Sequence, residues 1–140
     1  MQRFIVACCL SLGVVFAARA DQPQLSCSQP EDMLAEAECL KQEFRKAEKA
    51  LSEYLVVAQG KIDKENSGKP QLAATQAVWL KYRDAQCSDA YAYEEGGSLR
   101  YLAELQCKIE ATRSRTHAIW SAYLRGFGGA VLLLPEPDWH

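Results

Sequence analysis

A motif in the middle of the chain gives the first view of the fold: it reads QAVWLKYRDAQC over residues 76–87, and GGS over 96–98 and Cys107 follow it. The first part has no glycine or proline and suits a helix, whereas the glycine pair suits a turn. Cys87 and Cys107 lie ten residues before and after position 97. In a helical hairpin that turns at this point, both cysteines reach similar heights on adjacent antiparallel helices. The motif therefore predicts a helical hairpin stapled by a disulfide.

Two residues of the motif, Trp79 and Arg83, lie one helical turn apart. The guanidinium can therefore lie near the indole face or pair with an acid on a facing helix. We read Arg83, and Arg115 on the following helix, as residues that hold the fold, in preference to a ligand-binding role. We also expect Trp79 to be a buried indole on the central helix, whose removal destabilises the protein strongly.

Three helices are predicted between breaks at 60–70, at 96–98 and at 126–129, where glycine, proline and short polar residues gather. The first helix should begin near Pro30, with Ser28 as its candidate cap. Its apolar residues alternate in steps of four and three, which lays one seam along the helix. The seam consists of Met33, Ala37, Leu40, Phe44, Ala47, Leu51, Tyr54 and Ala58.

The second and third helices are expected over about 70–93 and about 98–124. The second should bury Leu72, Thr75, Trp79, Tyr82, Cys87 and Ala90. The third should bury Leu99, Leu102, Ile109, Thr112, Thr116, Ile119 and Tyr123, beside a stripe of small side chains at Ala103, Cys107 and Ala111. The proline-containing tail, residues 130–140, should pack back on the bundle.

The first twenty residues resemble a secretory signal peptide. Arg3 gives a positive start, residues 4–18 are almost wholly apolar, and Ala18-Arg19-Ala20 matches the A-x-A cleavage pattern. Cleavage after Ala20 would leave residues 21–140 as a single helical domain in the periplasm or outside the cell, with no stable membrane anchor. A lipobox-like alternative at Cys8 stays open, although fewer apolar residues precede it than a signal peptide normally has.

Of the six cysteines, Cys8 and Cys9 would leave with the signal peptide, so an even number remains in an exported chain. Such a pattern indicates disulfides, and no C-x-x-C pair favours zinc instead. If Cys87 pairs with Cys107, the segment before Pro30 is long enough for the other two to meet. The expected pairs are Cys27–Cys39 and Cys87–Cys107.

The charge balance of the mature chain is mildly acidic. The full chain has 16 basic and 18 acidic residues, and removal of residues 1–20 takes away Arg3 and Arg19 but no acid, which leaves 14 and 18 and a net charge of −4. This balance argues against a nucleic-acid partner and permits a basic protein partner.

Motifs for enzyme chemistry are missing from the sequence. It has no G-x-S-x-G, no H-E-x-x-H, no phosphate-binding glycine loop and no dinucleotide fingerprint. His117 is expected at the edge of the core or on the surface, since helical spacing places no acid or nucleophile near it. We therefore expect no enzyme activity, no catalytic residue, no cofactor and no metal, and a small hydrolase is the least favoured alternative.

The central motif resembles that of the lysozyme-inhibitor LprI-like family of bacterial secreted and periplasmic proteins. The resemblance rests on a Q-x-x-W-x-x-Y-R-D-x-x-C helix, a G-G-S turn and a following C, T and R, and it extends upstream to Cys39 and to LSEY at 51–54. It implies a disulfide-bonded helical bundle without enzyme activity. Its structural motif residues in this chain are Trp79, Tyr82, Arg83, Asp84, Thr112 and Arg115.

We therefore expect an exported binding protein. The resemblance implies that it inhibits lysozyme-type muramidases. The alternative is a periplasmic interaction or stress protein with another protein target. The turn between the second and third helices is the candidate partner contact, because it is short, lies near a disulfide and carries acids that suit a basic enzyme. Its residues are Glu94, Glu95, Gly96, Gly97 and Ser98.

Overall fold

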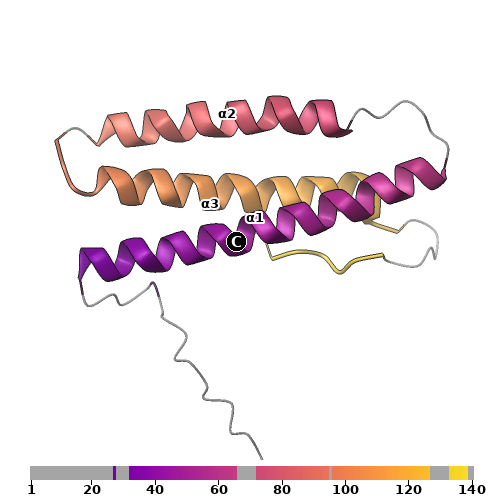
Figure 1. The fold of residues 1–140 in the computed structure, drawn as a ribbon, viewed down its shortest axis with the longest axis horizontal. Helices are drawn as coiled ribbons and strands as arrows, with labels where there is room; N and C mark the ends of the chain where they lie inside the picture. Colours follow the sequence, from indigo (N-terminus) through magenta and orange to yellow (C-terminus); the bar gives the residue numbers. More distant parts are fainter. Residues whose placement is uncertain (1–26, 28–31, 66–71, 95, 127–132, 139–140) are drawn as a thin grey trace, which may run out of the picture.

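A computed structural model describes residues 27, 32–65, 72–94, 96–126 and 133–138. Three long helices run alongside one another, and consecutive helices are antiparallel (Figure 1). The helix α3 lies in the middle and packs against both α1 and α2, whereas the backbones of α1 and α2 rarely come close and these two helices meet through side chains. No strand occurs within the described ranges. The elements are α1, Met33–Lys64; α2, Leu72–Tyr93; α3, Arg100–Ile119; and a short π-helix η1, Trp120–Leu124.

Two disulfides staple this bundle, so the expected all-α, disulfide-bonded fold is confirmed. Cys27 pairs with Cys39, and Cys87 on α2 pairs with Cys107 on α3. The paired Cα atoms lie 5.6 Å and 5.5 Å apart, which suits a disulfide without backbone movement.

The helix α1 begins and ends later than the sequence suggests. Asp32 is its N-cap and accepts a hydrogen bond from the Ala35 backbone N–H at 2.8 Å. The helix also continues through Gly60, which was expected to break it, and ends at Lys64. A helical glycine costs only about 1 kcal/mol, and Ile62 extends the apolar seam by one more turn and is buried. Met33, the first seam residue, is exposed because it lies at the helix end.

The helix α2 buries much less than its pattern suggests: only Leu72, Arg83 and Cys87 are buried. Tyr82 and Thr75 are exposed, and Trp79 is half-buried. The physical reason is the position of α2 at the edge of the bundle, where its backbone packs mainly on α3, although Leu72 shares an apolar cluster with α1 and Arg83 reaches Glu48. The expectation that Trp79 lies deep on a central helix is therefore wrong, since α3 is the central helix.

The helix α3 starts after Leu99, which is its N-cap and is exposed where a buried residue was expected. Its threonines are buried with their hydroxyl groups bonded. The Thr116 hydroxyl donates to the Thr112 carbonyl at 2.9 Å, a bond that lets a polar residue face a core. Three buried residues that the pattern missed, Leu105 on α3 and Trp120 and Leu124 on η1, complete the face toward α1.

The core has two apolar clusters, one in each half of the bundle. The first lies near the start of α1 and consists of Ala37, Leu40, Leu102, Leu105 and Ile109. The second lies near the end of α1 and consists of Leu51, Tyr54, Ala58, Ile62, Leu72, Ile119, Trp120 and Leu124.

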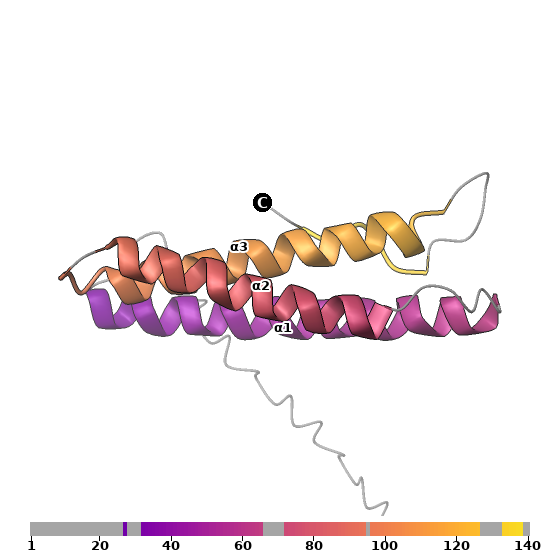
Figure 2. The same cartoon turned by 90° about the horizontal axis from the view of Figure 1, so that it is seen from above.

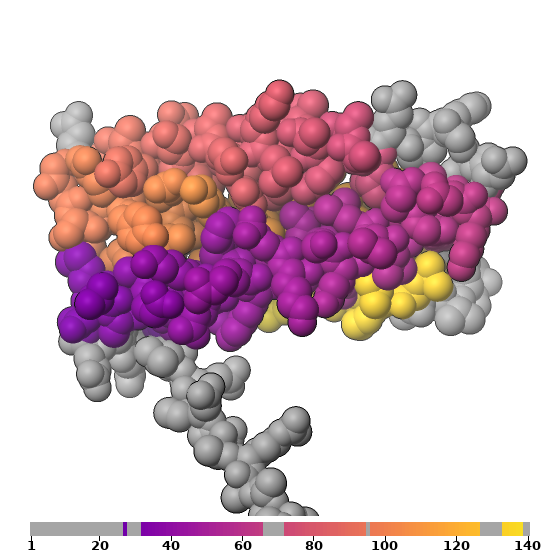
Figure 3. Space-filling model, in the orientation of Figure 1, coloured from indigo at the N-terminus to yellow at the C-terminus, as the bar shows by residue number. Residues whose placement is uncertain are grey.

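Residues 133–138 cover the second cluster, as expected for the tail (Figures 1 and 2). The Tyr54 hydroxyl donates to the Pro135 carbonyl at 2.7 Å, and the Trp120 indole N–H donates to the Leu134 carbonyl at 3.1 Å. Leu134 also packs against the cluster. The tail therefore runs back along the side of the bundle, in the half opposite the α2–α3 turn (Figures 1 and 3).

Several expected features lie outside the described residues. They are the signal peptide with its cleavage site and Cys8, the candidate cap Ser28, Pro30 at the predicted helix start, Glu95 in the turn, and Gly128 and Gly129 in the last break.

Candidate functional site

Arg83 is the centre of a polar network between the two apolar clusters. Its side chain is only 7% exposed. The Nη1 atom lies 3.3 Å from Glu48 Oε1 on α1 and 3.2 Å from the Thr112 hydroxyl on α3. Its Nε and Nη2 atoms each lie 3.1 Å from Asp84 Oδ1. One buried guanidinium thus joins all three helices, and its charge is balanced by two carboxylates.

Aromatic rings enclose this guanidinium. Its carbon lies 5.2 Å from the centre of the Phe44 ring and 5.4 Å from that of Trp79. The guanidinium of Arg115 lies 5.7 Å from the same indole, and Arg115 Nε donates to Gln76 Oε1 at 3.0 Å. Burial lowers the pKa of Arg115 from its ordinary value. Two cations thus share one indole, which positions both side chains.

The structure brings five of the six motif residues together: Trp79, Arg83, Asp84, Thr112 and Arg115. Tyr82 does not contact Arg83 in the network, but it lines the groove between α2 and α3 together with Trp79 and Arg115. The sequence analysis placed Phe44 on the apolar seam but did not identify it, Glu48 or Gln76 as a partner of the two arginines, because helical spacing gives no information on which facing helix a residue meets. It also missed an ion pair between Arg113 and Glu43 at 2.9 Å, which links α3 to α1.

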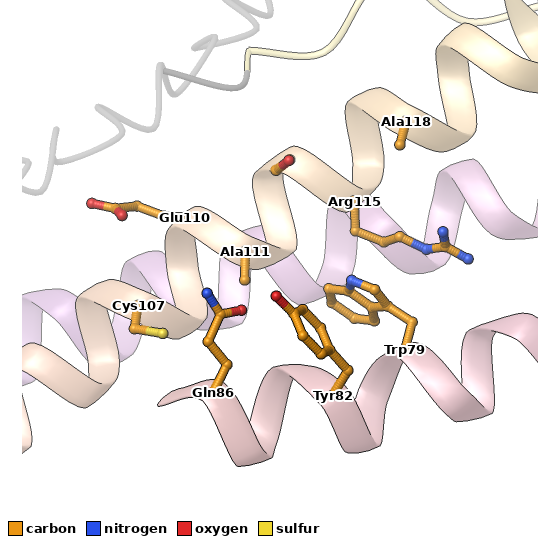
Figure 4. Close-up of a pocket in the computed structure, with 9 residues that line it drawn as sticks. Trp79, Tyr82, Gln86, Cys107, Glu110, Ala111, Arg115 and Ala118 are labelled. Atoms are coloured by element: carbon orange, nitrogen blue, oxygen red, sulfur yellow. The ribbon is translucent and has the colours of Figure 1, made fainter. Parts of the chain in front are cut away.

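An open groove of about 580 Å³ runs between α2 and α3 (Figure 4). Trp79, Tyr82 and Gln86 form its α2 wall, and their side chains extend toward α3. The α3 side carries small residues, including Ala111 and Ala118. The expected stripe of small side chains therefore forms part of this groove, with Cys107 in its disulfide.

The ionisable groups of the described residues form ion pairs at several points of the surface, and none of these resembles a metal site. No group of three or more His, Cys, Asp or Glu side chains suited to a metal occurs in the described ranges. His117, expected at the core edge, lies 3.0 Å from Glu136 Oε1 and beside the Trp120 ring. Glu136 belongs to the tail, so helical spacing could not have revealed this pair.

The α2–α3 turn is exposed and partly rigid. Glu94, Gly97 and Ser98 are exposed, and Gly96 has a φ of 76°, a conformation that favours glycine. The Cys87–Cys107 disulfide ties together the two helices that lead into and out of the turn. The described residues of the candidate contact thus lie exposed at the end of the bundle, and Glu95 is outside the described residues.

Comparison with known proteins relates this chain to a protein family and to a bacterial protein. The model of a protein family described as lysozyme inhibitor LprI matches residues 27–119. An uncharacterised protein of Rhizobium meliloti (strain 1021) is 31% identical over 123 residues, which covers 80% of this chain and 85% of that protein. No solved structure matches. Among the described residues, no helix is long and apolar enough to cross a membrane.

Proposed function

Because the chain belongs to the LprI family of lysozyme inhibitors, we propose that its mature domain binds a lysozyme-type muramidase and inhibits it. The observation that carries this proposal is the family match over residues 27–119. The matched range contains α1, α2 and α3 and all four cysteines of the two disulfides. The similarity therefore covers the whole stapled bundle, and the family is one of inhibitors that bind a protein and perform no reaction themselves.

The proposed mode of action is steric. A muramidase needs access to a polysaccharide, so a rigid protein that covers its cleft slows hydrolysis without any chemistry of its own. Rigidity before binding helps, because little conformational entropy is then lost in the complex. The two disulfides and the Arg83 network supply this rigidity.

Export from the cytoplasm is part of the same proposal, since muramidases attack the cell wall from outside the inner membrane. Disulfides are typical of oxidising compartments, and the A-x-A pattern before Asp21 supplies the cleavage site. Mass spectrometry of the protein from periplasmic extract should give a chain that begins at Asp21. A chain that begins at a lipid-modified Cys8 would replace this proposal with membrane anchoring.

The proposed contact includes the turn at 94–98. Glu94 is exposed and has no ion-pair partner among the described residues. Glu95 is adjacent in sequence. The exposed carboxylate of Glu94 attracts a basic enzyme and orients it during the encounter.

A turbidity assay on muramidase-treated cell walls tests the function. The purified mature domain, in micromolar excess, should slow the clearing of the suspension. The Glu94→Lys/Glu95→Lys variant should inhibit less. A matched control, Glu53→Lys/Glu65→Lys, makes the same change of charge at an exposed acid of α1 and at the C-cap of this helix, away from the turn, and should inhibit as the wild type does.

Absence of inhibition by the wild type would reject the lysozyme hypothesis for this protein and leave the alternative, a different periplasmic protein target. Equal inhibition by the wild type and the turn variant would retain the function and reject the acidic turn as its contact.

A further inference from the structure

Large apolar side chains are exposed at one end of the bundle, around the α2–α3 turn. Each of them lies within two residues of a helix end: at the start of α1, the end of α2 or the start of α3. Figures 1 and 2 show these three helix ends together at the same end of the molecule, and we call this end the tip. The exposed apolar residues of the tip are Met33, Leu34, Tyr93, Leu99 and Tyr101.

The exposure of these side chains is high: Leu34 is 77% exposed, Tyr93 86% and Leu99 55%. Single apolar residues on a surface are normal, but several that gather at one place indicate an interaction surface. Tyrosine is also enriched at protein interfaces, because its ring provides contact area and its hydroxyl tolerates water. The composition of the tip thus differs from that of an ordinary helix end, where short polar residues prevail.

An apolar cluster and both disulfides lie next to the tip and support it. The apolar cluster that contains Leu40 and Leu102 lies under it. Both disulfides belong to this half of the bundle: Cys39 is in the first turns of α1, and the Cys87–Cys107 bridge joins the last turns of α2 to the first turns of α3. Side chains fixed in this way lose little freedom when a partner covers them.

The charges of the tip favour a basic partner. Asp32 and Glu94 are exposed and Glu36 is half-buried, and none of the three forms an ion pair with another described residue. Asp32 does accept the N-cap hydrogen bond. The nearby cations lie against tyrosine rings, with Lys41 over Tyr101 at 5.5 Å and Arg100 over Tyr91 at 4.8 Å. The apolar residues are therefore accompanied by unpaired carboxylates.

On the premise of the proposed function, we infer that the whole tip, and not the turn alone, is the surface that docks on the muramidase. Leu34 and Tyr93 are its apolar anchors, contributed by α1 and α2. The unpaired carboxylates meet positively charged side chains of the enzyme. The start of α1 is thus part of the interface, which gives the Cys27–Cys39 disulfide a second role: it fixes the backbone that presents Leu34.

The α2–α3 groove is the competing surface. It also carries an exposed tyrosine, Tyr82, and an arginine whose Nε is bonded to Gln76. Its large apolar side chains come from α2 alone, however, whereas those of the tip come from all three helices.

Binding of purified muramidase to the full mature domain, measured by isothermal titration calorimetry, separates the two surfaces. The Leu34→Ser/Tyr93→Ala variant should bind at least about tenfold more weakly, as expected for anchor residues. The control Val56→Ser/Val78→Ser removes apolar side chains that are 69% and 68% exposed and lie away from the tip, and it should bind within about twofold of the wild type. Tyr82→Ala should do the same.

The inference is overturned if the tip variant binds as the wild type does, or if only Tyr82→Ala weakens binding. Circular dichroism verifies that each variant is folded. The milder Tyr93→Phe variant keeps the aromatic ring and should bind the muramidase as the wild type does. If the wild type itself neither binds nor inhibits a muramidase, the proposed function fails and the inference fails with it. A wild type that inhibits, with an unaffected tip variant, rejects the tip alone.

Discussion

Arg83 on α2 reaches Glu48 on α1, with 3.3 Å between Nη1 and Oε1, although the backbones of these two helices hardly contact each other. The same nitrogen also lies 3.2 Å from the Thr112 hydroxyl of the central helix. One side chain therefore couples the two outer helices through the middle of the bundle. A residue in this position should contribute strongly to stability, in agreement with its reading from the sequence as a residue that holds the fold.

Replacement of Arg83 by alanine should lower the free energy of unfolding by about 2 to 4 kcal/mol, because the packing and the bonds of a buried charge are lost together. Glu48→Gln should cost less than about 1 kcal/mol, since the Glu48 side chain is 47% exposed and water can replace its partner. Urea unfolding measures both values. Equal losses would contradict the central role of the guanidinium.

The two tryptophans should differ in their contribution to stability. Trp120 is 6% exposed and packs in the second cluster, so Trp120→Ala should cost about 3 to 5 kcal/mol. Trp79 is half-buried on the edge helix, and Trp79→Ala should cost about 2 kcal/mol because water can fill part of the space. The same urea experiment measures this difference. A larger loss of stability for Trp79→Ala than for Trp120→Ala would show that the contacts of the Trp79 indole with the two arginines stabilise the protein more than its partial burial suggests.

The contact between Tyr54 and the tail should make the protein less stable at alkaline pH. Burial raises the pKa of the Tyr54 hydroxyl, which donates to the Pro135 carbonyl. A group whose pKa is higher in the folded protein stabilises it fully below its unfolded pKa, near 10, and this contribution is lost as the pH rises through the folded value. The melting temperature should therefore fall above about pH 10.

Tyr54→Phe isolates this effect from the titration of the lysines and the other tyrosines. The variant should be about 1 kcal/mol less stable at neutral pH, because it lacks the hydrogen bond, and its melting temperature should fall less steeply above about pH 10. Identical pH profiles of the variant and the wild type would contradict the assignment.

The Cys87–Cys107 disulfide should contribute about 3 kcal/mol by restricting the unfolded chain, since it closes a segment with a sequence separation of 20. The Cys87→Ala/Cys107→Ala variant should unfold at correspondingly lower urea concentration. Peptide mapping without reductant checks the connectivity: a peptide that contains Cys27 linked to Cys87 or Cys107 would contradict it.

The sequence by itself determined the helical class, the number of helices and both disulfide pairs. These features depend on local information: the seam of α1 repeats along one helix, and the glycine pair at 96–97 fixes where the hairpin turns, so that Cys87 and Cys107 meet. Family membership followed from the same motif. Most of the expected seam of α1 is indeed buried, because a regular period leaves only one face to cover.

Only the tertiary structure decided which helix is central, and with it the environment of the motif. The pattern of α2 is equally compatible with a middle and an edge position, so burial of Tyr82 and Trp79 could not be judged from it. The partners of Arg83 and the pairing of His117 with Glu136 likewise join residues far apart in sequence. The gathering of Leu34, Tyr93 and Leu99 at one tip has the same origin, because periodicity describes the face of each helix and carries no information on which helix ends meet in space.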